Sequence, residues 1–176
     1  MFPINIHFLN RLHWINMSWT ILDIQGFKSS DNEFIVKELF ILKETSSSSF
    51  LFKPPFDKDK LSAKAKRSNQ YCTDNFHGLD WDSGEVPYCK MEEIIKSFCK
   101  DSKVVCKGSE KASFLRKILV GTQVLDLDLV LFKKLEDLEV DDIFCSNNHP
   151  GYTCAKKNCH KILQWWEKIV NFFEWF

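Results

Sequence analysis

The chain has 176 residues, of which 44% are hydrophobic and 27% are charged, and its formal net charge at pH 7 is zero. This length and apolar share are typical of one globular domain with its own core, and they exclude a disordered chain. The zero net charge argues against a broad phosphate-binding surface, which normally needs a basic excess.

The first sixteen residues show no hydrophobic period, whereas a strong strand pattern begins directly after Met17. We therefore expect an N-terminal extension over residues 1–16 and a single domain over residues 17–176. A docked N-terminal arm is the alternative for the first segment.

Three strands are predicted next. Ser18–Ile24 is apolar and β-branched and is expected to end at Gln25-Gly26. Phe34–Leu42 and Phe50–Lys53 follow. The linkers between them, including the serine run 46–49, are short and rich in turn residues, which favours an antiparallel meander.

Residues 57–70 favour a helix or loop, and their cationic residues form either a solvated face or a local basic strip: Lys58, Lys60, Lys64, Lys66 and Arg67. Residues 75–87 are expected to form a loop. Further on, helices are predicted over Met91–Lys100, 109–119 and 155–176, strands over Lys103–Cys106 and 123–127, and a turn over 147–151. This order predicts an α/β fold, a mixed sheet with flanking helices.

Three meander strands followed by alternating helices and strands are the order expected of the ribonuclease H-like fold. Within that order the chain resembles DEDDh-type 3′–5′ exonucleases of the superfamily over roughly residues 18–170. The motifs that carry the resemblance are Asp23-Ile24-Gln25-Gly26-Phe27, Phe52-Lys53-Pro54, His77-Gly78-Leu79, Phe114-Leu115, and His149 followed by Cys154. The first of these, with Cys154-Ala155, also resembles signatures of uncharacterised arthropod proteins, which favours a divergent family over a damaged enzyme.

The resemblance implies a two-metal site, and its positions fall here on Asp23, Gln25, Lys111, His149 and Cys154. Only Asp23 and His149 keep the residue type that the family has, the His as a general base. Two divalent cations need several converging carboxylates, and a lysine ammonium repels a cation. The site is therefore expected to be vestigial, with weak divalent-metal binding at Asp23 at most. Glu110 substitutes for a ligand only with a register shift.

Structural roles are the alternatives for the two retained residues. Asp23 at a strand end is also suited to capping the Gly26 turn. His149 is suited to a turn or to the start of a helix, or to binding zinc. If the exonuclease assignment is right, we expect Asp23, Lys111, His149 and Cys154 to meet at one end of the sheet.

The chain contains seven cysteines, an odd number, and its N-terminal residues lack the uninterrupted apolar run of a secretory signal. Reduced thiols in the cytoplasm or nucleus are expected, with no membrane association. An alternative zinc site would use Cys145, His149, Cys154 and Cys159. Their spacing fits no standard zinc finger, and buried thiols are the simpler interpretation.

The closing helix carries Ile162, Trp166, Ile169 and Phe173 at helical spacing, which predicts a core-facing stripe. Trp165, Phe172 and Trp175 lie beside this stripe and form either an apolar patch for a partner or a broadened core face.

The favoured function is a catalytically impaired exonuclease-fold module that binds a protein partner or a nucleic-acid end and needs no cofactor. One alternative is an active 3′–5′ exonuclease with rearranged ligands, which would use Mg²⁺ or Mn²⁺. The other is a zinc-stabilised interaction protein.

The closing helix is expected to stabilise the fold more than residues 1–16 do. Truncating a buried Trp typically costs about 3–5 kcal/mol, so Trp166→Ala should lower the melting temperature strongly. A chain starting at Met17 should melt within a few degrees of the full chain. Thermal melts of the three proteins test this, and the reverse ranking would make the N-terminal segment an integral part of the fold.

Overall fold

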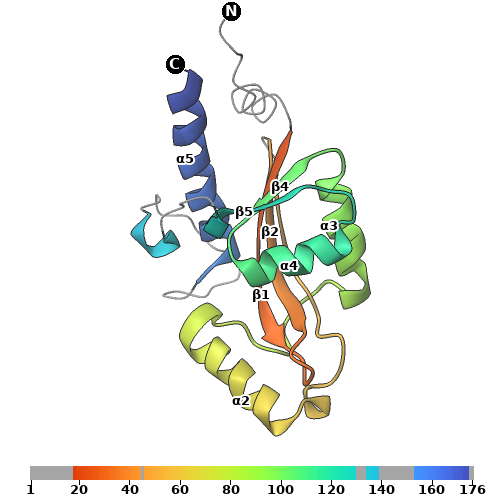
Figure 1. Cartoon of the computed structure of the whole chain (residues 1–176). Helices are drawn as coiled ribbons and strands as arrows, with labels where there is room; N and C mark the ends of the chain where they lie inside the picture. The colour runs from red at the N-terminus through yellow and green to blue at the C-terminus, as the bar shows by residue number, and fades with distance from the viewer. Residues whose placement is uncertain (1–17, 45, 130–133, 139–152, 175–176) are drawn as a thin grey trace, which may run out of the picture.

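The computed structural model describes residues 18–44, 46–129, 134–138 and 153–174, so the expected extension over residues 1–16 and the turn over 147–151 lie outside the described residues. One five-stranded sheet has the order β3-β2-β1-β4-β5 (Figure 1). The strands are β1 (Trp19–Lys28), β2 (Phe34–Lys43), β3 (Ser46–Leu51), β4 (Lys103–Cys106) and β5 (Val124–Asp126). The first three are antiparallel, while β4 runs parallel to β1 and β5 parallel to β4. The predicted α/β class with a mixed sheet is confirmed.

Within the described residues, four α-helices pack around the sheet: α2 (Ala63–Cys72), α3 (Met91–Cys99), α4 (Ser109–Ile118) and α5 (Ala155–Glu174). The short helices are η1 (Lys58–Lys60), the π-helical η2 (Thr73–His77), η3 (Tyr88–Lys90), η4 (Leu127–Leu129) and η5 (Leu135–Asp137). Local chemistry fixes the start of α2, where the Ser62 hydroxyl accepts the N–H of Ala65 at 3.2 Å. The ambiguous segment 57–70 is thus largely helical.

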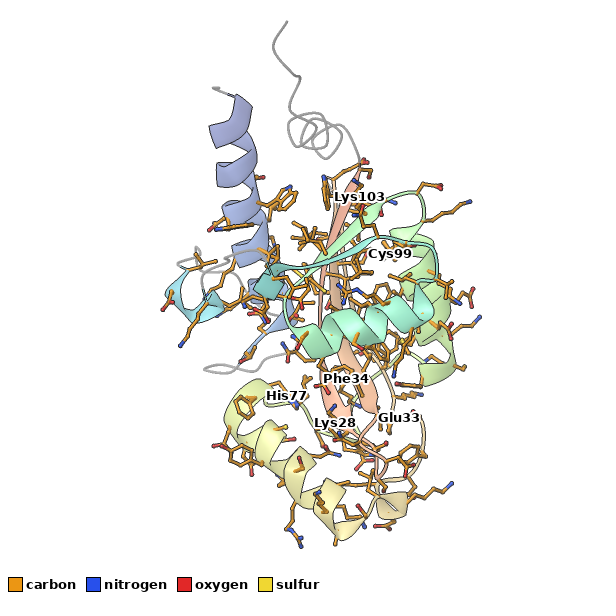
Figure 2. All side chains as sticks on the ribbon, viewed as in Figure 1. Lys28, Glu33, Phe34, His77, Cys99 and Lys103 are labelled. Carbon is orange, nitrogen blue, oxygen red and sulfur yellow. The ribbon has the colours of Figure 1, made fainter. Side chains whose placement is uncertain are left out.

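The two faces of the sheet are covered by different helices. Leu22 and Ile24 of β1 face a core shared with α3 and α4, whereas Ile21 belongs to a second core shared with α5. This alternation is the period of a strand buried on both faces. A third cluster around Phe27 and Trp81 lies under α2. Figure 2 shows Cys99 in the first core and His77 beside the α2 segment.

Two strand boundaries differ from the sequence-based prediction. The serine run 46–49 belongs to β3 rather than to a linker, because its backbone pairs with residues Phe40–Lys43 of β2. Small polar side chains suit an exposed edge strand, where one side of the backbone has no partner.

The predicted loop 75–87 also differs in part. Its first residues continue α2 as the π-helical turn η2, which ends at Gly78 with φ 64°.

β1 does not end at Gln25-Gly26 but continues to Lys28 through a β-bulge, in which Gln25 pairs with Glu38 and Gly26 with Val36. Glycine is required there, because a Cβ on Gly26 would lie 2.0 Å from the carbonyl oxygen of Ile35. Asp23 is therefore in the middle of the strand, and its expected role as a cap of a Gly26 turn is wrong.

The residue skipped by the bulge is Lys37, whose side chain is buried. Its ammonium donates hydrogen bonds to the carbonyl oxygens of Phe52 at 2.8 Å and Trp81 at 2.6 Å, and to that of Ser83. On the other strand, the buried His77 accepts the N–H of Leu79 at Nδ1, so its Nε2 donates to the Gly26 carbonyl at 3.1 Å. Both side chains tie the bulge to the loop that follows α2.

The described part of α5 packs on the sheet through Ile162, which is fully buried, and through Trp166, which contacts Trp19 with ring centroids 4.6 Å apart. Trp165 is also partly buried against this core. Of the two alternatives left open for Trp165, a broadened core face therefore describes it better than a separate surface patch. The side chains of Ile169, Phe172, Phe173 and Trp175 lie outside the described part of the chain.

Gly26→Ala should destabilise the fold by about 1–3 kcal/mol or more, because the new methyl group collides with backbone rather than with a movable side chain. Gly121→Ala is the control, since nothing lies within 4 Å of its Cβ and only its φ of 84° causes strain. Urea unfolding of the two variants measures the difference. Equal losses would contradict the steric explanation.

Candidate functional site

The centre of the candidate site is Asp23, which is fully buried in the middle of β1. Its Oδ1 accepts a hydrogen bond from Lys111 Nζ at 2.5 Å. Its Oδ2 accepts one from Gln25 Nε2 at 2.9 Å and one from Asn158 Nδ2 at 2.8 Å. Both carboxylate oxygens are thus bound by protein donors.

Each donor comes from a different element. Gln25 follows Asp23 by two positions on β1, so the two side chains emerge on the same face. Lys111 lies in the first turn of α4, which begins directly after Gly108, and the carbonyl of Gly108 accepts the N–H of Ala112 at 2.9 Å. Asn158 lies in the first turn of α5. The hydrogen bonds to Asp23 therefore depend on where α4 and α5 start relative to β1.

The start of α5 is held by a second buried acid. Glu38 lies opposite Gln25 on β2, is 1% exposed, and accepts the N–H of Ala155 through Oε2 at 3.1 Å. A carboxylate at a helix N-terminus satisfies a backbone donor and interacts favourably with the helix dipole. Glu38 consequently sets the position from which Asn158 reaches Asp23.

The charge of Asp23 is balanced by Lys111, whose side chain is 20% exposed whereas that of Asp23 is 0% exposed. An ionised carboxylate is costly to bury unless it is paired and hydrogen-bonded. Lys111 supplies both the pairing charge and one hydrogen bond. Its ammonium group therefore takes the place that a bound cation would need beside this carboxylate.

Two further acids, one at the end of β5 and one in the first turn of α4, are also engaged. Asp126, buried at the end of β5, accepts the N–H of Gly108 at 3.2 Å and that of Asp128 at 3.0 Å. Glu110, next to Lys111, forms an ion pair with Lys28. Within the part of the chain that the structure describes, no group of three or more His, Cys, Asp or Glu side chains is placed to hold a metal ion.

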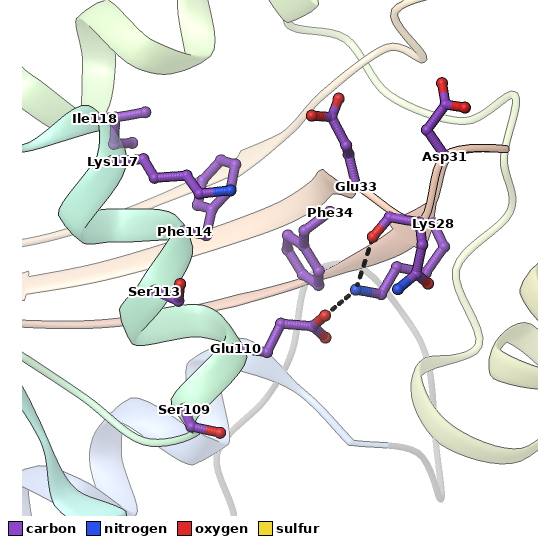
Figure 3. Close-up of a pocket in the computed structure, with 11 residues that line it drawn as sticks. Lys28, Asp31, Glu33, Phe34, Ser109, Glu110, Ser113, Phe114, Lys117 and Ile118 are labelled. Atoms are coloured by element: carbon purple, nitrogen blue, oxygen red, sulfur yellow. Dashed lines mark hydrogen bonds and ion pairs between the residues drawn. The ribbon is translucent and has the colours of Figure 1, made fainter.

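Glu110 borders a groove of about 600 Å³ between α4 and the turn that joins β1 to β2 (Figure 3). The rings of Phe34 and Phe114 lie in its lining, with centroids 5.6 Å apart. Glu110 and Lys111 are adjacent in the chain but have different partners. Glu110 forms an ion pair with Lys28 at this groove, whereas Lys111 forms one with the buried Asp23. The register shift that would bring Glu110 to Asp23 would break the ion pair with Lys28.

The structure brings together three of the predicted site residues, Asp23, Gln25 and Lys111. Cys154 is buried directly before α5, and its expected place beside Asp23 stays a prediction. His149 and Cys145 lie outside the described residues, so their place at the site stays a prediction. Cys159 is buried and its Sγ lies 3.5 Å from the carbonyl oxygen of Phe40.

Sequence reasoning missed Glu38, Asp126 and Asn158 as parts of the site. Glu38 did leave a signal, since a charged residue interrupts the apolar run of its strand. Asp126 left a weaker one as an acid at the end of a short strand. Asn158 is one polar residue among several near the start of a helix, and no local pattern distinguishes it.

The thiols near the site and in the core are held protonated. Burial raises the pKa of Cys106 to about 12, helped by the nearby charges of Asp126 and Asp23. Burial also raises the pKa of Cys99 to about 12 and that of Cys159 well above its usual value. Because thiolates are the reactive and metal-binding form, these groups are poor nucleophiles and poor ligands at neutral pH.

Comparison of the chain with known protein-family models and with curated proteins finds no match. Among the described residues, no helix combines the length and the apolar character needed to cross a membrane.

Lys111→Met should destabilise the fold by on the order of 3 kcal/mol, because it leaves the Asp23 carboxylate buried without its counter-charge. The double variant Asp23→Asn/Lys111→Met should regain a large part of that loss, since no charge is then buried. Chemical denaturation of the wild type, both single variants and the double variant gives the coupling energy. Additive effects would mean that the pair is not a coupled buried ion pair.

The buried thiols predict a loss of stability at alkaline pH. The pKa of Cys99 is raised from 9.0 to about 12 in the folded state, so the unfolded chain loses this proton first. The contribution is fully present below about pH 9 and is lost as pH rises toward 12. The unfolding free energy should therefore fall less steeply with pH in Cys99→Ala than in the wild type, measured over about two pH units from pH 8.5 to 10.5.

Two features of this pH experiment serve as checks. The exposed Cys89, replaced by Ala, should leave the wild-type slope unchanged. Lys37 acts in the opposite direction, because burial lowers its pKa to about 8, but its contribution is common to all the proteins compared. Identical slopes for Cys99→Ala and wild type would contradict the assignment.

Proposed function

We propose that this chain is an exonuclease-fold module of the ribonuclease H-like type that has lost metal-dependent catalysis and acts by binding a nucleic-acid strand or a protein. One observation carries the proposal: Lys111 Nζ lies 2.5 Å from Oδ1 of Asp23. A two-metal nuclease needs that carboxylate free to bind cations. Here the carboxylate is bound by an ammonium group and two amides instead.

The order of the strands and helices and one contact between distant residues support this proposal. Three antiparallel strands precede alternating helices and strands, as expected of the ribonuclease H-like fold. Asp23 and Lys111, two of the positions that the exonuclease resemblance singles out, are in direct contact although they are 88 residues apart in the sequence. Fold alone does not fix function, and the loss of chemistry rests on the charges at the site.

The two alternatives receive less support. An active exonuclease with rearranged ligands would need new acids near Asp23, but Glu110 pairs with Lys28 and Asp126 accepts two backbone N–H groups. A zinc-stabilised protein would need deprotonated thiols, and the pKa of Cys159 is raised by burial. We propose a location in the cytoplasm or nucleus, which the free thiols among the described residues support.

Isothermal titration with Mg²⁺ or Mn²⁺ should give no binding heat for the wild-type protein at about millimolar ion, because Lys111 repels a cation at Asp23. Labelled single strands incubated with either ion should stay intact. A binding isotherm that disappears in Asp23→Ala, or digestion that depends on Asp23, would overturn the proposal.

The double variant Gln25→Glu/Lys111→Asp tests whether cation binding can be restored at this site. It places three carboxylates at the positions that the exonuclease resemblance assigns to acids, so it should gain binding heat with Mn²⁺. Circular dichroism verifies that the variant is folded. A folded double variant that binds no cation would count against the match between this site and the family.

A further inference from the structure

Helix α2 is fixed to the sheet by one face only. Its buried residues are Ala65 and Asn69. The Asn69 side chain accepts the backbone N–H of Lys28 at 2.9 Å and donates to the carbonyl of the same residue at 2.8 Å. This two-way pairing anchors the helix at the end of β1, and the opposite face of α2 points outward at one end of the molecule (Figure 1).

Two aromatic side chains lie exposed together at the end of this helix. Tyr71 is 59% exposed and Phe76 is 49% exposed, and their rings are 5.6 Å apart at an angle of 73°. Among the described residues they are the only strongly exposed aromatic side chains. Single exposed apolar residues need no explanation, but a pair of contacting rings on the surface does.

The π-helical turn η2 explains how the two rings meet. Residues five apart lie on different sides of an α-helix, but they lie nearly above one another where the turn widens to a π-helix. The backbone here is held in place, because the Asn75 side chain donates to the Tyr71 carbonyl at 2.9 Å and the Phe76 carbonyl accepts the N–H of Thr153 at 2.5 Å. The aromatic pair is therefore presented on a fixed backbone, and π-helical turns of this kind are frequent at functional sites.

The same helix face is cationic. Lys64 and Arg67 are exposed and precede Tyr71 by seven and four positions, which places them on its side of the helix. The nearby acids are partly engaged, since Asp59 pairs with Lys66 and Asp74 accepts from Gln70. Neither Lys64 nor Arg67 pairs with an acid among the described residues. In a chain of zero net charge, this face therefore carries two exposed cations beside the aromatic pair.

We propose that this outer face of α2 binds single-stranded nucleic acid, with bases stacked on Tyr71 and Phe76 and phosphates bound by Lys64 and Arg67. Exposed rings interleaved with cations are the surface that unpaired bases and their backbone require. A duplex keeps its bases stacked on each other and leaves the rings unused. The inference gives a surface and a ligand class to the binding role proposed above, and it does not depend on whether the Asp23 site is inactive.

Fluorescence anisotropy tests this with labelled oligo(dT) and oligo(rU) of about 20 nucleotides, in EDTA so that no metal-dependent cleavage intervenes. We expect dissociation constants in the range of about 1–100 µM, typical of binding without sequence preference. Tyr71→Leu/Phe76→Leu keeps apolar bulk but removes the stacking faces, and it should weaken binding about tenfold or more. A DNA duplex of the same length should bind more weakly than either single strand.

Charge variants give an independent readout. Lys64→Gln/Arg67→Gln should weaken binding and should reduce the slope of log K against log salt by about 1.4, the value for two phosphate contacts on a single strand. The matched control Lys90→Gln/Lys96→Gln removes two exposed lysines from the α3 region and should leave affinity and slope near those of wild type.

The ratio of the wild-type affinities for oligo(dT) and oligo(rU) shows whether DNA or RNA is the preferred strand.

Three results would overturn the inference: no single-strand binding by the wild type, binding that the α2 variants do not alter, or equal weakening by the control variant. Full competition by an acidic peptide, with no effect of the leucine variants, would instead identify an acidic protein partner. Digestion of strands by Mg²⁺-loaded protein would overturn the loss of catalysis but would leave the α2 surface standing, so the two proposals fail separately.

Discussion

A fully buried carboxylate in the middle of the central strand constrains the whole fold. Asp23 is acceptable in the core only while Lys111, Gln25 and Asn158 all reach it. The first turn of α4, the first turn of α5 and the bulge that follows Gln25 must therefore each take one position. Buried polar networks of this kind allow fewer alternative packings than an apolar core does, because a half-satisfied network is strongly unfavourable.

The polar groups of this network are buried and bonded to one another, whereas the groups proposed to bind a ligand are exposed on the surface. Inside, Asp23 in the middle of β1 and Asp126 at the end of β5 accept hydrogen bonds from an ammonium group, amides and backbone N–H groups. Outside, the face of α2 offers exposed rings and cations.

Sequence reasoning succeeded where a signal is local or follows an ordered series. The apolar runs predicted the sheet, and the motif order led to the contact between Asp23 and Lys111. It failed where a distant partner decides. The serine run became a strand because β2 supplies its hydrogen bonds, and the β1 strand passed Gly26 because a bulge on β2 accommodates it. Asn158 could not be found because its partner lies far away in the chain.

That long separation bears on how the protein folds. Asp23 and Asn158 are 135 residues apart, and Asp23 and Lys111 are 88 apart. During synthesis, β1 emerges early, but its buried acid has no complete set of donors until the start of α5 has left the ribosome. Contacts of such high sequence separation slow folding, and exposed strands in the meantime are prone to aggregate. Docking of α5 is therefore the step that completes the set of donors around Asp23.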